Sequence, residues 1–97
     1  MHVLHIEYPV PDYDAWKAAF DRDALDREGS GGRRYRVLRP TDDPTHAIIE
    51  LDFDEAGEAE AYLAALQRAV YSSREASAVV GSGPQTRVVE VVESKEY

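Results

Sequence analysis

Two histidines and a glutamate, His5, His46 and Glu50, are the residues of this sequence best suited to acid–base or ligand chemistry. An imidazole exchanges a proton near neutral pH and binds divalent metals. If these residues lie on β-strands, the alternation of side chains places them and Glu7 on one face of a sheet. The plainer interpretation, which we favour, is that they are interface groups paired with carboxylates. With three histidines and no metal-ligand spacing, the sequence predicts no metal site.

A run of basic residues holds Arg33, Arg34, Arg36 and Arg39. Arg34 and Arg36 could clamp a carboxylate ligand through paired hydrogen bonds. The alternative is that they neutralise acidic side chains on neighbouring strands. Acidic residues outnumber basic ones on the predicted face, so the sequence favours the second interpretation.

Three aromatic residues on the expected inner faces of two helices, Trp16, Phe20 and Tyr62, form a second candidate site. They would wall a ligand space between the helices and the sheet. The hydroxyls of Tyr8, Tyr13 and Tyr62 could reach the same space. Aromatic residues at helical spacing are more often plain core, so the sequence leaves both roles open.

The segments that carry these residues have hydrophobic periods in the order β-α-β-β-α-β. Strand patterns cover residues 2–8, 33–39, 46–53 and 87–93, and helical patterns cover residues 12–28 and 55–70. Asp12 suits the N-cap of the first helix, and residues 41–44 predict a hairpin between the second and third strands. Residues 72–80 could add a short helical turn. This order predicts the ferredoxin-like α+β fold, a four-stranded antiparallel sheet with both helices on one face.

The two faces of the predicted sheet differ in composition. The face under the helices is apolar, with Leu4, Ile6, Val37, Ile49, Leu51, Val89 and Val91 packed on Trp16, Phe20, Tyr62, Leu63 and Leu66. The opposite face mixes apolar and charged side chains, namely Val3, His5, Glu7, Arg34, Arg36, Leu38, His46, Ile48, Glu50, Val88, Glu90 and Val92. A bare antiparallel face would be more uniformly polar, so this mixture predicts a homodimer whose sheets pack face to face. The aromatic candidates and the histidine set then lie on opposite faces and form no single site.

Composition limits the possible classes of function. The 97 residues predict one domain over residues 1–97. A net charge of −8 repels phosphate backbones and anionic membranes, so we expect no nucleic acid and no membrane as partner. The absence of cysteine excludes disulfides and thiolate chemistry. The sequence shows neither a leader pattern nor an apolar run of membrane-spanning length, from which we expect a cytoplasmic protein.

Four segments carry a resemblance to a known family: the strand HVLHIEY, the helix start PDYDAW, the segment YRVLRPTDDPTHAIIELDFD and the helix EAGEAEAYLAAL. Together they resemble the dimeric α+β barrel superfamily, in particular small proteins similar to the antibiotic-biosynthesis-monooxygenase group. The resemblance implies a homodimer, often with a small-molecule cavity between sheet and helices. Activities in the superfamily include cofactor-free oxygenation, haem degradation, isomerisation and lyase chemistry.

The resemblance does not extend to a catalytic motif. Haem-degrading members use an Asn, a Trp and a His of the second helix, whereas this chain has no Asn and no His in residues 55–70. We therefore expect no cofactor. Cofactor-free oxygenases of the group use Tyr, Trp and Arg, and Trp16, Tyr62 and Arg36 match these types without matching by position.

Two functions remain open from the sequence. The first is a dimeric barrel that binds a small aromatic or polyketide-like molecule and could act as a cofactor-free monooxygenase. The second is a non-catalytic structural or regulatory dimer with a polar interface between its sheets.

Overall fold

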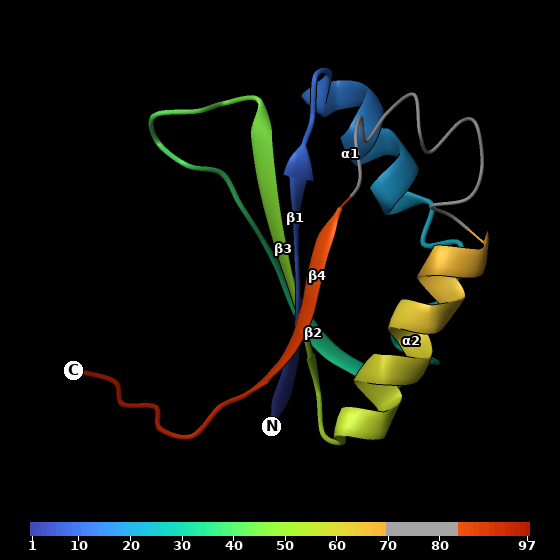
Figure 1. Ribbon diagram of the computed structural model, residues 1–97, viewed down its shortest axis with the longest axis vertical. Coiled ribbons are helices and arrows are strands. Elements are labelled where there is room, and N and C mark those ends of the chain that lie inside the picture. Colours follow the sequence, from blue (N-terminus) through green and yellow to red (C-terminus); the bar gives the residue numbers. More distant parts are fainter. Residues whose placement is uncertain (70–83) are drawn as a thin grey trace.

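The computed structural model describes residues 1–69 and 84–97. In these residues the elements are β1 (His2–Pro9), α1 (Tyr13–Asp21), β2 (Gly32–Leu38), β3 (His46–Phe53), α2 (Ala56–Ala69) and β4 (Gln85–Glu90). The strands form one antiparallel sheet in the order β2-β3-β1-β4. Both helices lie on the same side of this sheet (Figure 1). The predicted ferredoxin-like α+β fold is confirmed.

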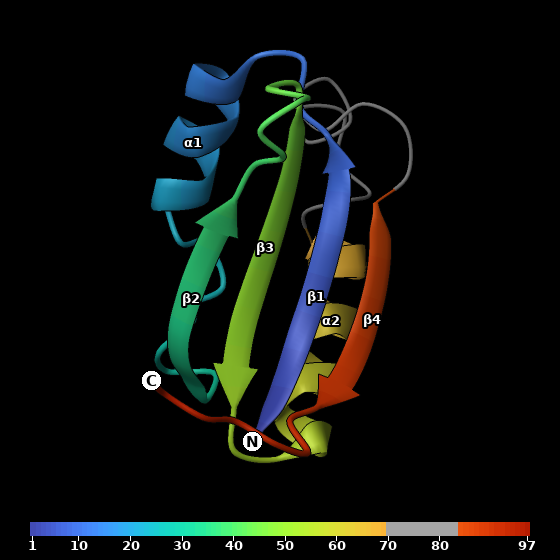
Figure 2. The same ribbon diagram turned by 90° about the vertical axis from the view of Figure 1, so that its left-hand side faces the viewer.

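Strand β1 lies inside the sheet, between β3 and β4 (Figure 2). Its apolar residues Leu4 and Ile6 alternate with His5 and Glu7, so one face is apolar and the other polar. The antiparallel register places Leu4 beside Leu51 and Ile6 beside Ile49. We call the polar side, which lies opposite the helices, the helix-free face.

The core fills the space between the sheet and the two helices. The sheet contributes Leu4, Ile6, Tyr8, Ala47, Ile49, Leu51 and Phe53, and the helices contribute Trp16, Ala59, Tyr62 and Leu66. Phe20, Val37 and Leu63 are partly buried against this cluster. Burial of this apolar surface is the main force that holds the helices on the sheet.

Helix α1 begins as expected and ends early. The Asp12 carboxylate accepts a hydrogen bond from the Ala15 backbone N–H at 3.1 Å and caps the helix. The apolar spacing predicts a helix through residue 28, yet α1 ends at Asp21. Asp23 and Asp26 adopt positive φ angles of 50° and 51°, and their side chains accept backbone N–H bonds of later residues. Such local bonds compete with helical ones and explain the early end.

Strand β4 differs from the prediction in both position and parity. It spans Gln85–Glu90, with Val88 beside Leu4 and Val89 beside Val3. Val88 therefore packs on the core and Val89 lies on the helix-free face, the reverse of the predicted assignment. The sequence RVVEVVE has paired valines and reads equally well in either parity, so pairing with β1 decides it.

Three other residues predicted from the same strand also lie elsewhere than expected. Glu90 lies beside His2, on the helix side rather than the helix-free face. Val91 and Val92 follow the end of β4 and are exposed, so Val91 is no core residue and Val92 no member of the sheet face.

Helix α2 agrees with its predicted range of residues 55–70 as far as Ala69. The Glu58 side chain accepts a hydrogen bond from the Glu55 backbone N–H at 3.2 Å, which satisfies one group at the helix start. Residue 70 and the helical turn expected at residues 72–80 lie outside the described residues. Among the helices described, none is long and apolar enough to cross a membrane.

Candidate functional site

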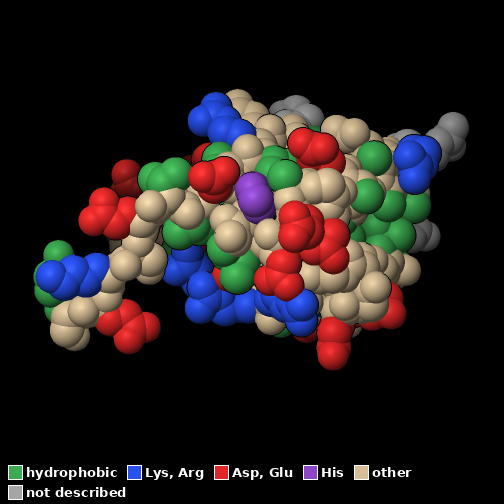
Figure 3. All heavy atoms as spheres, turned by 90° about the horizontal axis from the view of Figure 1, so that it is seen from below, with side chains coloured by type: hydrophobic (Ala, Val, Ile, Leu, Met, Phe, Trp, Pro, Cys, Tyr) green, Lys and Arg blue, Asp and Glu red, His purple; other side chains and the backbone are tan. Residues whose placement is uncertain are grey.

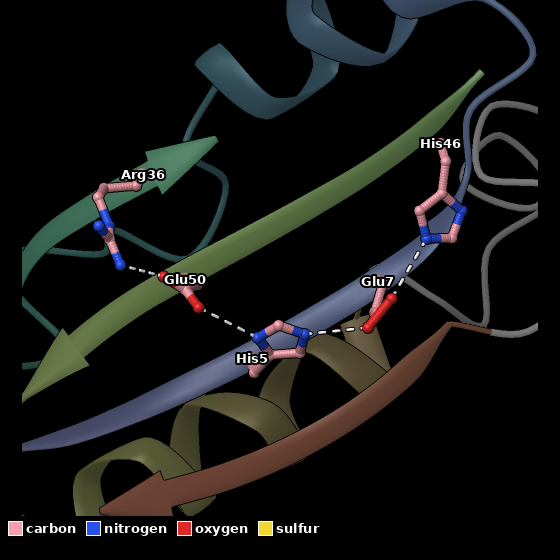
Figure 4. A network of polar contacts seen from close by, with 5 residues as sticks. All are labelled: His5, Glu7, Arg36, His46 and Glu50. Carbon is pink, nitrogen blue, oxygen red and sulfur yellow. Dashed lines mark hydrogen bonds and ion pairs between the residues drawn. The ribbon is translucent and has the colours of Figure 1, made fainter. Parts of the chain in front are cut away.

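Five charged or titratable side chains meet in a row across the helix-free face (Figure 4). The His5 ring lies between two carboxylates, with Nδ1 3.2 Å from Glu50 Oε2 and Nε2 3.1 Å from Glu7 Oε2. The second oxygen of Glu7 lies 3.3 Å from His46 Nε2. The second oxygen of Glu50 accepts a hydrogen bond from Arg36. We call this row, Arg36–Glu50–His5–Glu7–His46, the polar chain.

Strand alternation and register assemble the polar chain. His5 and Glu7 are two residues apart on β1, and His46 and Glu50 share the parity of β3 that points to the same face. The register places His5 directly beside Glu50, which lies beside Arg36 of β2. The structure therefore brings together His5, Arg36, His46 and Glu50, the set expected from parity, with Glu7 as the link.

Hydrogen bonding shapes the electrostatics of the polar chain. Hydrogen bonds from His5 and then from His46 hold the pKa of the Glu7 carboxyl below its ordinary value of 4.5. Ionised carboxylates only accept hydrogen bonds, and both ring nitrogens of a histidine donate only when the ring is protonated. The Glu7 carboxylate is therefore a hydrogen-bond acceptor for both histidine rings.

The rest of the helix-free face carries apolar side chains, the Arg34–Asp52 ion pair and Arg87. Arg34 Nε donates to the Asp52 carboxylate at 2.8 Å, and Asp52 is buried. In the described residues, three arginines (Arg34, Arg36, Arg87) balance three acids (Glu7, Glu50, Asp52) on this face. Val3, Leu38, Ile48 and Val89 surround them. A patch without net charge thus lies on a chain of net charge −8.

Aromatic rings join α1 to the sheet on the opposite side. The Trp16 ring stacks on Phe20 with centroids 5.1 Å apart, and Phe20 meets Tyr35 of β2 edge-on at 5.0 Å. Tyr8 of β1 and Tyr13 also contact Trp16, at 6.3 and 5.7 Å. We call these five residues the aromatic cluster. It runs from the buried Tyr8 to the 42% exposed Tyr35.

The buried end of the cluster is fixed by one hydrogen bond. Trp16 Nε1 donates to the Tyr8 hydroxyl at 2.5 Å. Burial raises the pKa of Tyr8 to about 12, so its hydroxyl stays protonated through the neutral range. The sequence suggested Tyr8 only as a weak hydroxyl donor. Its parity with Leu4 and Ile6 was the signal that places it under the helices.

Arg27 connects the cluster to α2. Its guanidinium carbon lies 4.0 Å from the Phe20 ring centroid and 5.1 Å from that of Tyr35. It also donates to the Phe20 carbonyl at 3.0 Å. Burial raises the pKa of Tyr62, and the charge of Arg27 opposes that rise. The sequence analysis missed Arg27, because it falls in the segment predicted to be helical.

The two candidate sets are separate. Trp16, Phe20 and Tyr62 lie under the helices, where Tyr62 packs on Phe53 with ring centroids 5.8 Å apart. The polar chain lies across the sheet from them. Within residues 1–69 and 84–97, no group of three or more His, Asp or Glu side chains is arranged to hold a metal ion.

Comparison with known proteins places this geometry among solved structures. No family model and no curated protein matches the chain. An MhuD variant with two manganese protoporphyrin IX molecules per active site matches at a TM-score of 0.73 and 19% identity, over 100% of both chains. A variant of SnoaB, a cofactor-independent oxygenase from Streptomyces nogalater, matches at 0.73 and 15%, over 96% of this chain and 94% of SnoaB.

A dimeric ferredoxin-like protein from an uncultured marine organism matches at a TM-score of 0.70 and 10% identity, over 97% of each chain. The chain therefore shares the ferredoxin-like α+β fold of these structures. Identities this low establish the shared fold, and the function has to be argued from the residues of this chain.

Proposed function

We propose that the protein is a homodimer that binds a planar aromatic molecule between α1 and the sheet. The aromatic cluster is the observation that carries this proposal. Large rings, rather than close backbone approach, attach α1 to the sheet. A flat aromatic ligand could make the same stacked and edge-on contacts with these rings that they make with one another.

The position of the cluster supports binding from solvent. Tyr13 and Phe20 are partly buried and Tyr35 is exposed, so the cluster has an accessible end. The protonated Tyr8 hydroxyl and the Arg27 guanidinium supply polar groups beside the rings. Apolar walls with a few polar groups are typical of small-molecule sites. The ligand class that fits is an aromatic or polyketide-like molecule that carries hydroxyl or carboxyl groups.

The finer proposal is a cofactor-free oxygenase. SnoaB, which has the same fold, is a cofactor-independent oxygenase. Without a flavin or metal, the substrate itself must reduce O₂, so it must be an electron-rich phenol. The role of this chain's residues would be to bind and orient that substrate and to exclude water.

Haem, the ligand class of the MhuD complex, does not fit these residues. An axial histidine would have to reach the helix side of the sheet. His5 and His46 belong to the polar chain on the other face. His2 is on the helix side but at the opposite end of β1 from Tyr8 and the aromatic cluster, with its Nδ1 3.3 Å from the Asp54 carbonyl oxygen and its Nε2 3.6 Å from Glu90 Oε2.

The proposed dimer packs helix-free face on helix-free face. That face carries apolar residues that a monomer leaves in water, and it has no net charge to oppose self-association. Its ion pairs His5–Glu50, Arg34–Asp52 and Arg36–Glu50 form within one protomer, so these charges are already compensated before two faces meet. One matched structure is that of a dimeric ferredoxin-like protein, which supports dimerisation of this fold.

A titration with alizarin, a hydroxylated anthraquinone, tests the ligand site. We expect saturable binding that Phe20→Ala weakens at least tenfold. His5→Ala, a matched change on the opposite face, should leave the affinity unchanged. Haemin in the same assay should give no Soret shift of a histidine-ligated haem. Binding that depends on His5 and not on Phe20 would contradict the proposed site.

The alternative function is a non-catalytic dimer whose polar chain only holds the interface. One observation favours it: each member of the polar chain is hydrogen bonded to another member. The alternative would be favoured if the protein is a dimer in solution and its melting temperature does not rise with aromatic ligands, haemin or divalent metals in a thermal-shift screen.

A further inference from the structure

Two of the three histidines of the sequence, His5 and His46, belong to the polar chain on the helix-free face (Figure 4). Each of these side chains is 29% exposed in one protomer, so protons from the solvent can reach both rings. Face-to-face packing of two copies would bury both rings between the sheets. Any change in the charge of these rings would therefore act directly on the interface.

We propose that His5 and His46 make the dimer sensitive to pH, so that their protonation drives the two copies apart. This inference rests on the face-to-face dimer proposed above. An imidazole gains a positive charge as the pH falls from about 8 to about 5. The two rings would thus convert a small change of pH near neutrality into a change of charge within the interface.

The charge balance of the helix-free face sets the direction of this effect. With neutral histidines, the three arginines and three acids described on this face sum to zero. Protonation adds one positive charge at each of the two rings and no negative charge, so each copy contributes an excess of two positive charges. Two packed sheets lie about 10 Å apart, and charges buried between them are screened little by salt. The excess charges of the two copies therefore repel each other in the dimer.

Charged groups from all four strands surround His5. Glu7 of β1 and Glu50 of β3 contact its ring. Arg87 of β4 lies beside it in the register of the sheet, and Arg36 of β2 reaches it through Glu50. Both helices lie on the other side of the sheet (Figure 1). The positive charges of Arg36 and Arg87 thus already offset the two carboxylates that flank the ring.

The acids near His46 keep their charge while the ring gains one. Its ring contacts Glu7, and its charge acts on Asp43 of the preceding turn. Hydrogen bonds from His5 and then His46 lower the pKa of Glu7, and hydrogen bonds from Thr45 lower the pKa of Asp43. Arginines stay charged throughout the range between about pH 8 and 5. The two rings are therefore the described groups of this face that we expect to change charge in this range.

The net charge of the whole chain would act in the opposite direction. The chain carries −8 with neutral histidines, and acid makes this charge smaller. A smaller net charge weakens the repulsion between copies and would favour the dimer. A dimer that weakens in mild acid therefore points to local charge on the helix-free face.

The third histidine provides an internal control. His2 lies on the helix side of the sheet, with its Nε2 3.6 Å from Glu90 Oε2. The view from the end of the molecule where β1 begins shows a histidine among acidic side chains (Figure 3). Protonation of His2 adds charge outside the proposed interface, so His2→Gln should keep the full response to pH.

Sedimentation equilibrium at two pH values tests the inference. We expect the dimer dissociation constant to rise at least tenfold from about pH 7.5 to about pH 5.5. In the double variant His5→Gln/His46→Gln, which has no titrating ring in the polar chain, the constant should change less than twofold. His46→Lys carries a fixed positive charge and should weaken the dimer already at the higher pH. Thermal melts at both pH values establish that each variant is folded.

The outcomes separate this inference from the proposed dimer. A chain that stays near 11 kDa at both pH values refutes the dimer and, with it, the response to pH. A dimer whose dissociation constant changes less than twofold, or falls in acid, overturns the response to pH alone. A response as large in the double variant as in the wild type would also overturn it, because other groups would then be responsible.

Discussion

The hydrogen bond between Trp16 and Tyr8 joins two buried polar groups of the aromatic cluster. Tyr8→Phe removes the acceptor and leaves the buried indole N–H without it. Loss of one such bond costs about 1–3 kcal/mol. We expect urea denaturation to show a loss of stability in this range, with an unchanged m-value.

The same tyrosine gives a pH signature. The raised folded pKa of about 12 means that unfolded chains lose this proton near 10 while folded chains keep it. Stability from Tyr8 is therefore full below pH 10 and is lost as the pH rises toward 12. In an absorbance titration, Tyr8→Phe should remove the latest tyrosine ionisation. A titration with the late step intact would contradict this assignment.

The contribution of Glu7 to folding stability changes with pH in the opposite direction to that of Tyr8. Its folded pKa is lowered, so its contribution is present above the ordinary value of 4.5 and is lost as the pH falls through the folded value. Glu7→Gln should destabilise the protein by less than about 1 kcal/mol at neutral pH, because the side chain is partly exposed. Urea titrations at a series of pH values, at one protein concentration, should show the gap between variant and wild type closing below 4.5. A gap that persists in acid would mean that packing, not charge, causes the effect.

At the scale of elements, the parity of β4 makes a paired prediction. Val88 packs on the core and Val89 lies on the helix-free face. Val88→Asp should cost about 1–3 kcal/mol, because it places a charge at a partly buried position against the core. Val89→Asp should leave the monomer stable and weaken dimerisation. Chemical denaturation and sedimentation of both variants check this prediction. If Val89→Asp destabilises the fold more than Val88→Asp, Val89 is the core residue, as the sequence predicted.

Clear alternation decided which elements the sequence could predict. The faces of β1 and β3 follow from the alternation of Leu4 with His5 and of Ile49 with Glu50, and this fixed the polar chain in advance. The predicted helix was too long because Ala24 continues the spacing of Trp16 and Phe20, whereas Leu25 is the residue of this segment that packs against the core. Only the tertiary fold shows that Asp23 turns the chain with a positive φ. The bond between Tyr8 and Trp16 depends on how α1 docks, which no local pattern contains.

At the scale of the whole molecule, the proposed dimer predicts an effect of charge that depends on position. Glu50→Lys breaks the contacts to His5 and Arg36 and places like charges together on the helix-free face. We expect it to raise the dimer dissociation constant at least tenfold by sedimentation. Glu60→Lys makes the same change in net charge on exposed α2 and should not weaken the dimer. Equal effects of the two variants would show that net charge, not this face, governs association.

Trp16 is the only tryptophan of the chain, and it is 3% exposed within the aromatic cluster. Its fluorescence therefore reports on one place, the seat of α1 on the sheet. A flat ligand that enters there should quench or shift the emission, whereas dimerisation through the opposite face should leave it nearly constant. Tryptophan fluorescence can therefore follow ligand binding in a sample in which the protein also dimerises, because dimerisation does not change the emission.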